Sequence, residues 1–136
     1  MWAWTDSPLA CVLCQAPAQL KAPAQFEGRL QEWNGLFECI YRLWLDSGDY
    51  EAWAEGQLED LASPINRQGR QLVSQLAEHF EVYYYCRSMP ERQVPNCPLC
   101  GKLGVRLVQG RLAQAACKSC LLVWPTLPFQ LACLMD

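Results

Sequence analysis

Residues 97–120 read CPLCGKLGVRLVQGRLAQAACKSC and decide how the C-terminal third of the chain folds. Two CxxC pairs lie in this stretch, and the sixteen residues between them give the spacing of a zinc ribbon. Each pair supplies two thiolates from one turn, and a hairpin between the pairs brings all four sulfurs around one Zn²⁺ at about 2.3 Å. The sequence therefore predicts zinc bound by four cysteines: Cys97, Cys100, Cys117 and Cys120.

The residues around the first pair fit a metal-binding turn. Pro98 stiffens the turn, and Gly101 suits a backbone position with positive φ. A redox-active pair is the alternative, because CPLC also looks like an oxidoreductase active site. The second CxxC pair and the lack of a βαβ pattern around Cys97 argue against that alternative. Four thiolates fill the zinc shell, which favours a structural site over a catalytic one.

Length and composition limit the class of protein. A chain of 136 residues, 51% hydrophobic with six tryptophans, predicts one domain or one domain with a small module. No run reaches the ~18 apolar residues of a membrane span, and the first residues lack the basic region of a signal peptide. Nine cysteines, an odd number with three CxxC pairs, favour metal thiolates in a reducing cytosol over a disulfide framework. We therefore expect a cytoplasmic protein that does not enter the membrane.

Charge is divided unevenly along the chain. Residues 1–91 carry six Lys/Arg and thirteen Asp/Glu, whereas residues 92–136 carry five Lys/Arg and a single acidic residue. The net charges are −7 and +4, and zinc with four thiolates adds a formal −2 to the second segment. An anionic partner for the ribbon is one interpretation. A solvated surface, or a basic ribbon docked on its own acidic helices, is the other.

A helical body is predicted before the ribbon. Over residues 25–46 the apolar positions alternate by four and three, which predicts one face of a helix: Phe26, Leu30, Trp33, Phe37, Ile40 and Trp44. A second helix is expected from a cap at Asp49 to about Leu61, with five residues inward: Tyr50, Trp53, Ala54, Leu58 and Leu61. A third begins at Ser63 and Pro64 and runs to about Phe80. The aromatic stripes are interpreted as helical core, not as a cofactor site.

Strands are expected after the helices. The segment EVYYYCR (81–87) is rich in β-branched and aromatic residues and predicts a strand, followed by a linker over 88–96. In the ribbon, 103–108 and 121–124 are the predicted strands, with Gln109-Gly110 as the turn. The expected fold is α+β: a body of about three helices plus a short strand over 1–91, then a four-cysteine zinc ribbon and an apolar tail over 92–136.

A third CxxC pair, Cys11 and Cys14, lies in a Pro- and Ala-rich segment and has no obvious second pair. It could form part of a second metal site or a redox pair. The residues that could complete a site are Cys39, Cys86, Cys133 and His79. Buried or free thiols are the alternative.

Catalytic motifs are missing from the sequence. The chain contains no GxxxxGK[ST], GxGxxG, GxSxG or HExxH. Any Cys–His or Ser–His pair would have to use His79, the single histidine, and Cys86 is the cysteine near it in sequence. The carboxylates of the predicted helices recur at helical spacing, as on a solvated face. We therefore expect no enzyme and no small-molecule substrate.

Several blocks of the chain, in this order, resemble an uncharacterised bacterial family of zinc-ribbon proteins whose suggested role is nucleic-acid binding. The blocks are SPLACVLC (7–14), LWLDSGDYEAWAEGQLED (43–60), SPINRQG (63–69), VYYYCR (82–87), CPLCG (97–101) and CKSCLLV (117–123). The resemblance covers roughly residues 7–124 and implies zinc at the four ribbon cysteines and a helical body before them. Family members have an additional N-terminal region, so the resemblance implies a shorter relative or a fragment.

Three functions are compatible with the sequence. A nucleic-acid-binding ribbon would contact phosphates without reading bases, through Lys102, Arg106, Arg111 and Lys118. It would lack a stacking platform, since no aromatic residue lies between Gly101 and Val123. A protein-interaction adaptor would instead use the Trp-rich helix and the apolar tail. Thiol or metal sensing through Cys11 and Cys14 is the third hypothesis. The sequence thus predicts a non-enzymatic binding module whose partner is nucleic acid or protein.

Overall fold

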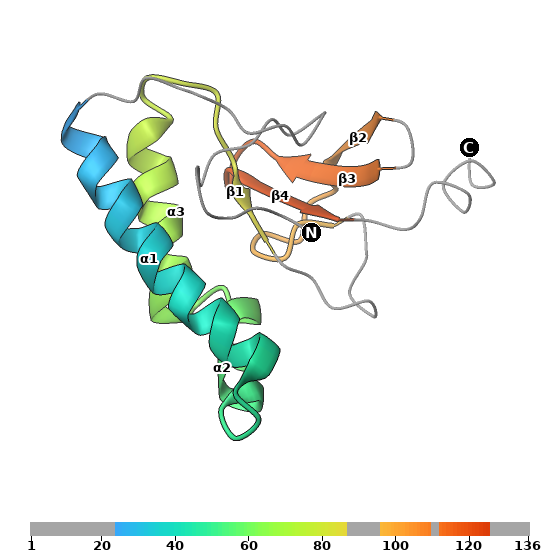
Figure 1. The fold of residues 1–136 in the computed structure, drawn as a ribbon. Helices are drawn as coiled ribbons and strands as arrows, with labels where there is room; N and C mark the ends of the chain where they lie inside the picture. The colour runs from blue at the N-terminus through green and yellow to red at the C-terminus, as the bar shows by residue number, and fades with distance from the viewer. Residues whose placement is uncertain (1–23, 87–95, 110–111, 126–136) are drawn as a thin grey trace. The chain divides into compact units, whose positions relative to one another are not determined.

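The computed structural model describes residues 24–86, 96–109 and 112–125, and it divides the chain into two compact units, Met1–Phe80 and Glu81–Asp136 (Figure 1). The fold mixes helices and strands, with a cysteine cluster in the C-terminal region. The described helices are α1 (Ala24–Asp46), α2 (Glu51–Glu59) and α3 (Pro64–Leu76). The described strands are β1 (Tyr84–Tyr85), β2 (Val105–Gln109), β3 (Leu112–Cys117) and β4 (Leu122–Pro125). No helix in these described ranges is both long and apolar enough to cross a membrane.

Helix α1 forms one arm of the first unit and follows the bounds predicted from its apolar periodicity. Phe26 is buried near its start, and the aromatic residues that follow are half-buried in a row along the helix. Ring centroids in this row are 5.2 Å apart for Trp33 and Phe37. The indole Nε1 of Trp33 also donates a hydrogen bond of 2.8 Å to the carbonyl of Ile65 in α3. The aromatic stripe is therefore part of the contact between helices.

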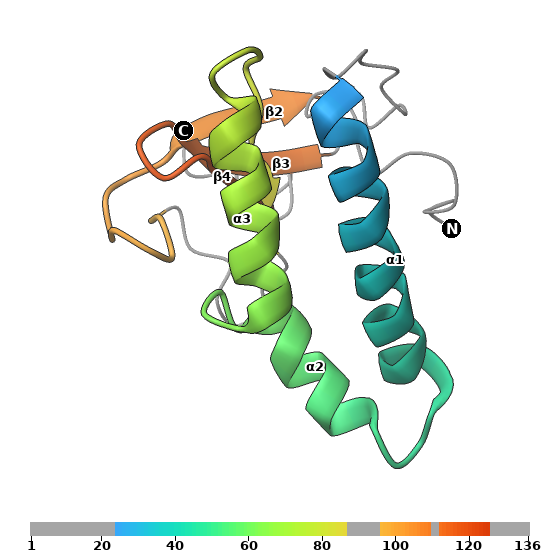
Figure 2. The same ribbon diagram turned by 90° about the vertical axis from the view of Figure 1, so that its left-hand side faces the viewer.

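Helices α2 and α3 follow one another as a single bent arm beside α1 (Figure 2). Ser63 is the N-cap of α3, as predicted, with its side chain accepting from the backbone N–H of Asn66. Asn66 is buried and its Nδ2 donates to three carbonyls at the end of α2: those of Gln57, Leu58 and Asp60. These bonds satisfy groups that a helix C-terminus leaves unpaired. The predicted helical body of about three helices thus forms two arms: α1 is one, and α2 with α3 is the other. The chain does not reverse its direction at the break over 60–63.

The predicted start of α2 is wrong, and its predicted inward face is confirmed at Ala54 and Leu58 but not at Tyr50 and Trp53. Tyr50, not Asp49, is the N-cap, and no side chain caps the helix there. Tyr50 and Trp53 are 60% and 53% exposed, because Ala54 and Leu58 form the buried face of this short helix. Helix α3 also ends earlier than expected, at Leu76.

The second unit is built on a sheet with the strand order β1-β4-β3-β2. Strands β2 and β3 form an antiparallel pair, as do β3 and β4. The sequence interpretation placed strands over 103–108 and 121–124 and missed β3 between them. The sequence of β3, LAQAAC, has no β-branched or aromatic residue and therefore little intrinsic strand preference. It becomes a strand because it pairs on both sides.

Strand β1 is shorter than the predicted strand over 81–87. It pairs in parallel with β4, and the backbone N–H of Tyr84 donates to the carbonyl of Leu121 at 2.7 Å. Two of the largest fully buried side chains, Leu122 and Trp124, lie on β4. The buried part of the ribbon therefore centres on this strand.

Candidate metal centre

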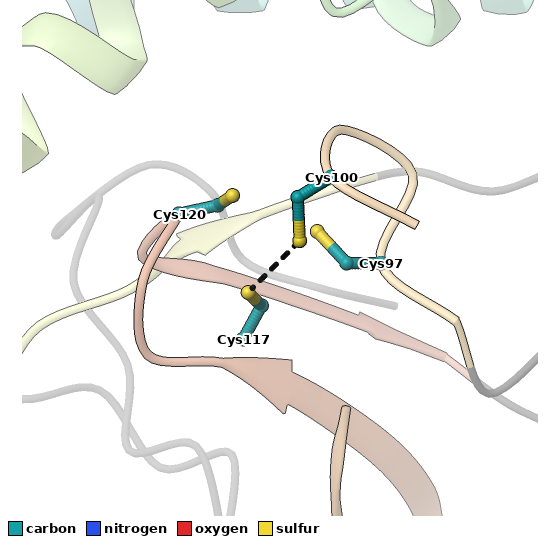
Figure 3. A group of neighbouring side chains, drawn as sticks. All are labelled: Cys97, Cys100, Cys117 and Cys120. Carbon is teal, nitrogen blue, oxygen red and sulfur yellow. Dashed lines mark hydrogen bonds between the residues drawn. The ribbon is translucent and has the colours of Figure 1, made fainter. Parts of the chain in front are cut away.

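Four cysteine side chains from two separate turns converge in the second unit (Figure 3). Cys97 and Cys100 lie in the turn before β2, Cys117 ends β3, and Cys120 lies in the turn that leads to β4. Their sulfur atoms all lie within 4.8 Å of one another. The β2–β3 hairpin thus brings together the two CxxC pairs that are distant in sequence, and the cluster could hold a metal ion.

The spacing of the sulfurs fits a tetrahedral ion. Four sulfurs at ~2.3 Å from a central zinc are about 3.8 Å apart, from tetrahedral geometry. The Sγ atoms of Cys100 and Cys117 are separated by 3.8 Å (Figure 3). This separation is far longer than the ~2.05 Å bond of a disulfide. Four soft sulfur donors in this geometry are typical of zinc or an iron–sulfur site.

Each CxxC turn is closed by a residue with positive φ. In the first turn the N–H of Gly101 donates to the carbonyl of Cys97 at 2.9 Å, and φ at Gly101 is +75°. In the second turn Leu121 takes the equivalent position, directly after the second cysteine, with φ of +55°. The sequence marked only the first of these positions, because glycine signals positive φ and leucine does not. Aligning the two CxxC pairs would have identified Leu121.

Without a cation, the cluster favours a mixture of thiols and thiolate. Burial raises the pKa of the Cys97 thiol, and it raises the pKa of Cys120 to about 12, assisted by hydrogen bonds with the neighbouring cysteines. A hydrogen bond from the backbone of Lys102 lowers the pKa of the exposed Cys100 to about 7. Four thiolates this close together repel one another, so ionisation of the whole set requires a bound cation.

Three of the four cationic residues predicted to contact nucleic acid lie in the described part of the chain. Lys102, Arg106 and Lys118 are exposed, whereas Arg111 lies outside the described residues. Lys102 and Lys118 each lie within two residues of a cluster cysteine. A zinc ion with four thiolates carries a formal −2, so these lysines are placed to offset that charge. Their charge would then be less available to a phosphate backbone.

The predicted second site is not formed by the described residues. Cys11, Cys14 and Cys133 lie outside them. Cys39 is exposed on α1 and Cys86 is buried. The ring of His79 makes an edge contact with Phe26, at a centroid distance of 6.0 Å. Within 24–86, 96–109 and 112–125, the ribbon cysteines are the one group that could hold a metal.

Comparisons of the chain with protein-family models, with curated proteins and with solved structures give no significant match. The resemblance of the sequence blocks to a bacterial zinc-ribbon family therefore stays a prediction. The function has to be argued from the cysteine cluster and the surface around it.

Proposed function

We propose that this chain is a non-enzymatic interaction module built on a zinc ribbon. The observation that carries the proposal is the convergence of four cysteine sulfurs within 4.8 Å. Zinc bound by Cys97, Cys100, Cys117 and Cys120 would have a complete coordination shell, with no open position for water or substrate. The metal would hold two turns together, and function would reside in the surface that the ribbon presents.

X-ray absorption at the zinc edge tests this structural role directly. The expected spectrum for the purified protein fits four sulfur ligands at about 2.3 Å, with one zinc per chain by elemental analysis. A spectrum that requires a nitrogen or oxygen ligand would indicate an open or mixed site, and the proposal of a purely structural metal would be abandoned.

A protein is the partner favoured by the exposed side chains. Leu103 is 74% exposed and Val105 53% exposed, whereas Trp124, the one aromatic residue in the described parts of 96–125, is 1% exposed. The start of β2 and the residues just before it therefore offer aliphatic surface for protein contacts, and the described part of the hairpin offers no aromatic face for stacking bases.

Nucleic acid is the second candidate, supported by charge. The described ribbon residues, 96–109 and 112–125, include no Asp or Glu, and Lys102, Arg106 and Lys118 are exposed. Binding of this type would tolerate any sequence and would weaken with added salt, with a shallow slope because few phosphates are neutralised. Fluorescence anisotropy of labelled DNA and RNA at low and moderate salt distinguishes the candidates. Lys102→Gln with Lys118→Gln should weaken nucleic-acid binding for all sequences alike.

A further inference from the structure

Helix α2 turns two aromatic side chains toward solvent. Ala54 and Leu58 form its buried side, whereas Tyr50 and Trp53 are each more than half exposed. Residues three apart on a helix are neighbours, so the two rings lie on one side of α2. The helical unit therefore presents an aromatic surface that its own core does not cover.

Further residues of α2 extend this surface. Gly56 and Asp60 follow Trp53 by three and seven positions, which places them along the same side of the helix, and Asp49 directly precedes Tyr50. A Cβ atom at Gly56 would meet no atom within 4 Å, so the space beside Trp53 is open. We call the surface formed by Asp49, Tyr50, Trp53, Gly56 and Asp60 the Trp53 face.

The Trp53 face lies in a strongly acidic part of the chain. Residues 43–66 contain six Asp/Glu and no Lys, Arg or His. Asp49 is exposed, and its carboxylate makes no hydrogen bond or ion pair within the described residues. Asp60 accepts from the N–H of Ala62 at 2.9 Å with Oδ1, which leaves Oδ2 for another donor. Charge complementarity therefore favours a cationic occupant beside the exposed rings.

We propose that the Trp53 face binds an arginine-containing segment of a partner protein. This role is separate from the zinc-ribbon function, because the helical unit presents the surface. A guanidinium group is planar, so it can stack on the indole of Trp53 while it donates paired hydrogen bonds to a carboxylate such as that of Asp49. A lysine ammonium lacks this planar fork. Rings and carboxylates on one surface thus favour arginine.

Charge argues against the competing occupants. Nucleic acid and anionic membranes would be repelled by the six carboxylates of residues 43–66. A second copy bound through the same face would bring two sets of carboxylates together. A second copy could offer its ribbon instead, but Lys102 and Lys118 are placed to offset the charge of zinc-bound thiolates, and Arg106 already has an interaction within its own chain. A separate protein is the favoured partner.

The test is an NMR titration of the full chain with blocked peptides in which arginine alternates with glutamine. We expect shifts at the amides of residues 49–60 and at the indole N–H of Trp53. Peptides with citrulline, a neutral side chain of nearly the same shape as arginine, should produce none, and lysine peptides should bind more weakly. Trp53→Ala should weaken binding about tenfold, the effect of losing one central contact. Asp49→Asn should weaken it to a smaller extent.

Gly56→Leu separates obstruction of the surface from unfolding. Leucine is more favourable than glycine inside a helix, so this variant should be at least as stable as the unaltered chain. Its side chain would fill the open space beside Trp53 and should weaken binding of the arginine peptides. The matched controls are Leu36→Ala and Glu32→Gln, both at exposed positions of α1, and neither should change binding.

Four results would overturn the proposal: no binding of any arginine peptide, equal binding of citrulline peptides, or unchanged binding after Trp53→Ala or after Gly56→Leu. Calcium binding that Asp49→Asn abolishes, without peptide binding, would overturn it in favour of a cation site. Self-association weakened by Trp53→Ala and by Lys102→Gln with Lys118→Gln, again without peptide binding, would overturn it in favour of a second copy. Zinc content measured on the same samples tests the ribbon function separately, because protein that lacks zinc should still bind the arginine peptides.

Discussion

The helical unit and the ribbon are stabilised in different ways. The helices share a distributed apolar core: Phe26, Leu30, Ala54, Leu58, Ile65, Leu72 and Leu76. The ribbon has strands of two to six residues, a buried cluster around Trp124, and four cysteines at one end. Loss of one contact should weaken the helical unit, whereas loss of a metal bound at the four cysteines would remove a constraint on both ribbon turns at once. The predictions below test this difference.

The largest effect is expected from Cys117→Ser. Structural zinc contributes on the order of 10 kcal/mol to small zinc modules, and three ligands hold it less well than four. We expect loss of bound zinc and of the folded ribbon, with most helical circular dichroism retained. Elemental analysis and far-UV circular dichroism measure both. Cys39→Ser is the control, because Cys39 is an exposed thiol on α1. One full zinc per chain in Cys117→Ser would be inconsistent with the four-cysteine site.

Within the helical unit, Asn66→Ala is expected to cause the largest loss of stability from removal of a polar side chain. The substitution removes the side-chain donor of the Leu58 and Asp60 carbonyls, whereas the Gln57 carbonyl keeps its hydrogen bond from the Ser63 hydroxyl. The free energy of unfolding should fall by about 2 kcal/mol, since the Leu58 carbonyl loses its donor and the bonds of the buried Asn66 amide are lost. Urea denaturation followed by circular dichroism measures the loss, with the exposed Gln68→Ala as the control. Zinc content should not change, and a drop in it would show that the two units are coupled.

Glycine-to-alanine substitutions should have opposite signs in the two units. Gly104→Ala places a methyl group 2.8 Å from the Trp124 ring and should destabilise the ribbon by about 1 to 3 kcal/mol. Gly28 lies within α1 with nothing within 4 Å of the added atom, so Gly28→Ala should stabilise the helix by up to ~1 kcal/mol. Thermal unfolding monitored separately by ribbon and helix NMR signals reports both. Equal effects of the two substitutions would contradict the close approach of Gly104 to the Trp124 ring.

The smallest effects are expected at the two positive-φ positions. Gly101→Ala should cost about 1 kcal/mol from backbone strain, because the added methyl meets no neighbour within 4 Å. Leu121→Gly should relieve strain of similar size at the second turn, offset by greater flexibility of the unfolded chain. Zinc competition with a chromogenic chelator should show weaker retention in the first variant and nearly unchanged retention in the second. A large loss of zinc in Leu121→Gly would show that the Leu121 side chain supports the site.

The sequence predicted those features that depend on local chemical rules. Apolar periodicity located α1, the Ser63-Pro64 pair located the start of α3, and the CxxC spacing identified the cysteines that cluster. The sequence failed where tertiary pairing decides. Strand β3 is Ala-rich and is a strand only because β2 and β4 flank it. The exposure of Trp53 could not be inferred from periodicity, since a nine-residue helix gives too few turns to define its buried face.

The most direct test of this difference is amide hydrogen exchange, resolved by residue, on the zinc-loaded protein before and after a strong chelator is added. We predict that amides of β3 and β4 lose their protection when zinc is removed, while amides in α1 and α3 keep theirs. Unchanged protection in β3 and β4, or simultaneous loss in α1 and α3, would contradict a metal-dependent ribbon beside a helical unit that folds on its own core.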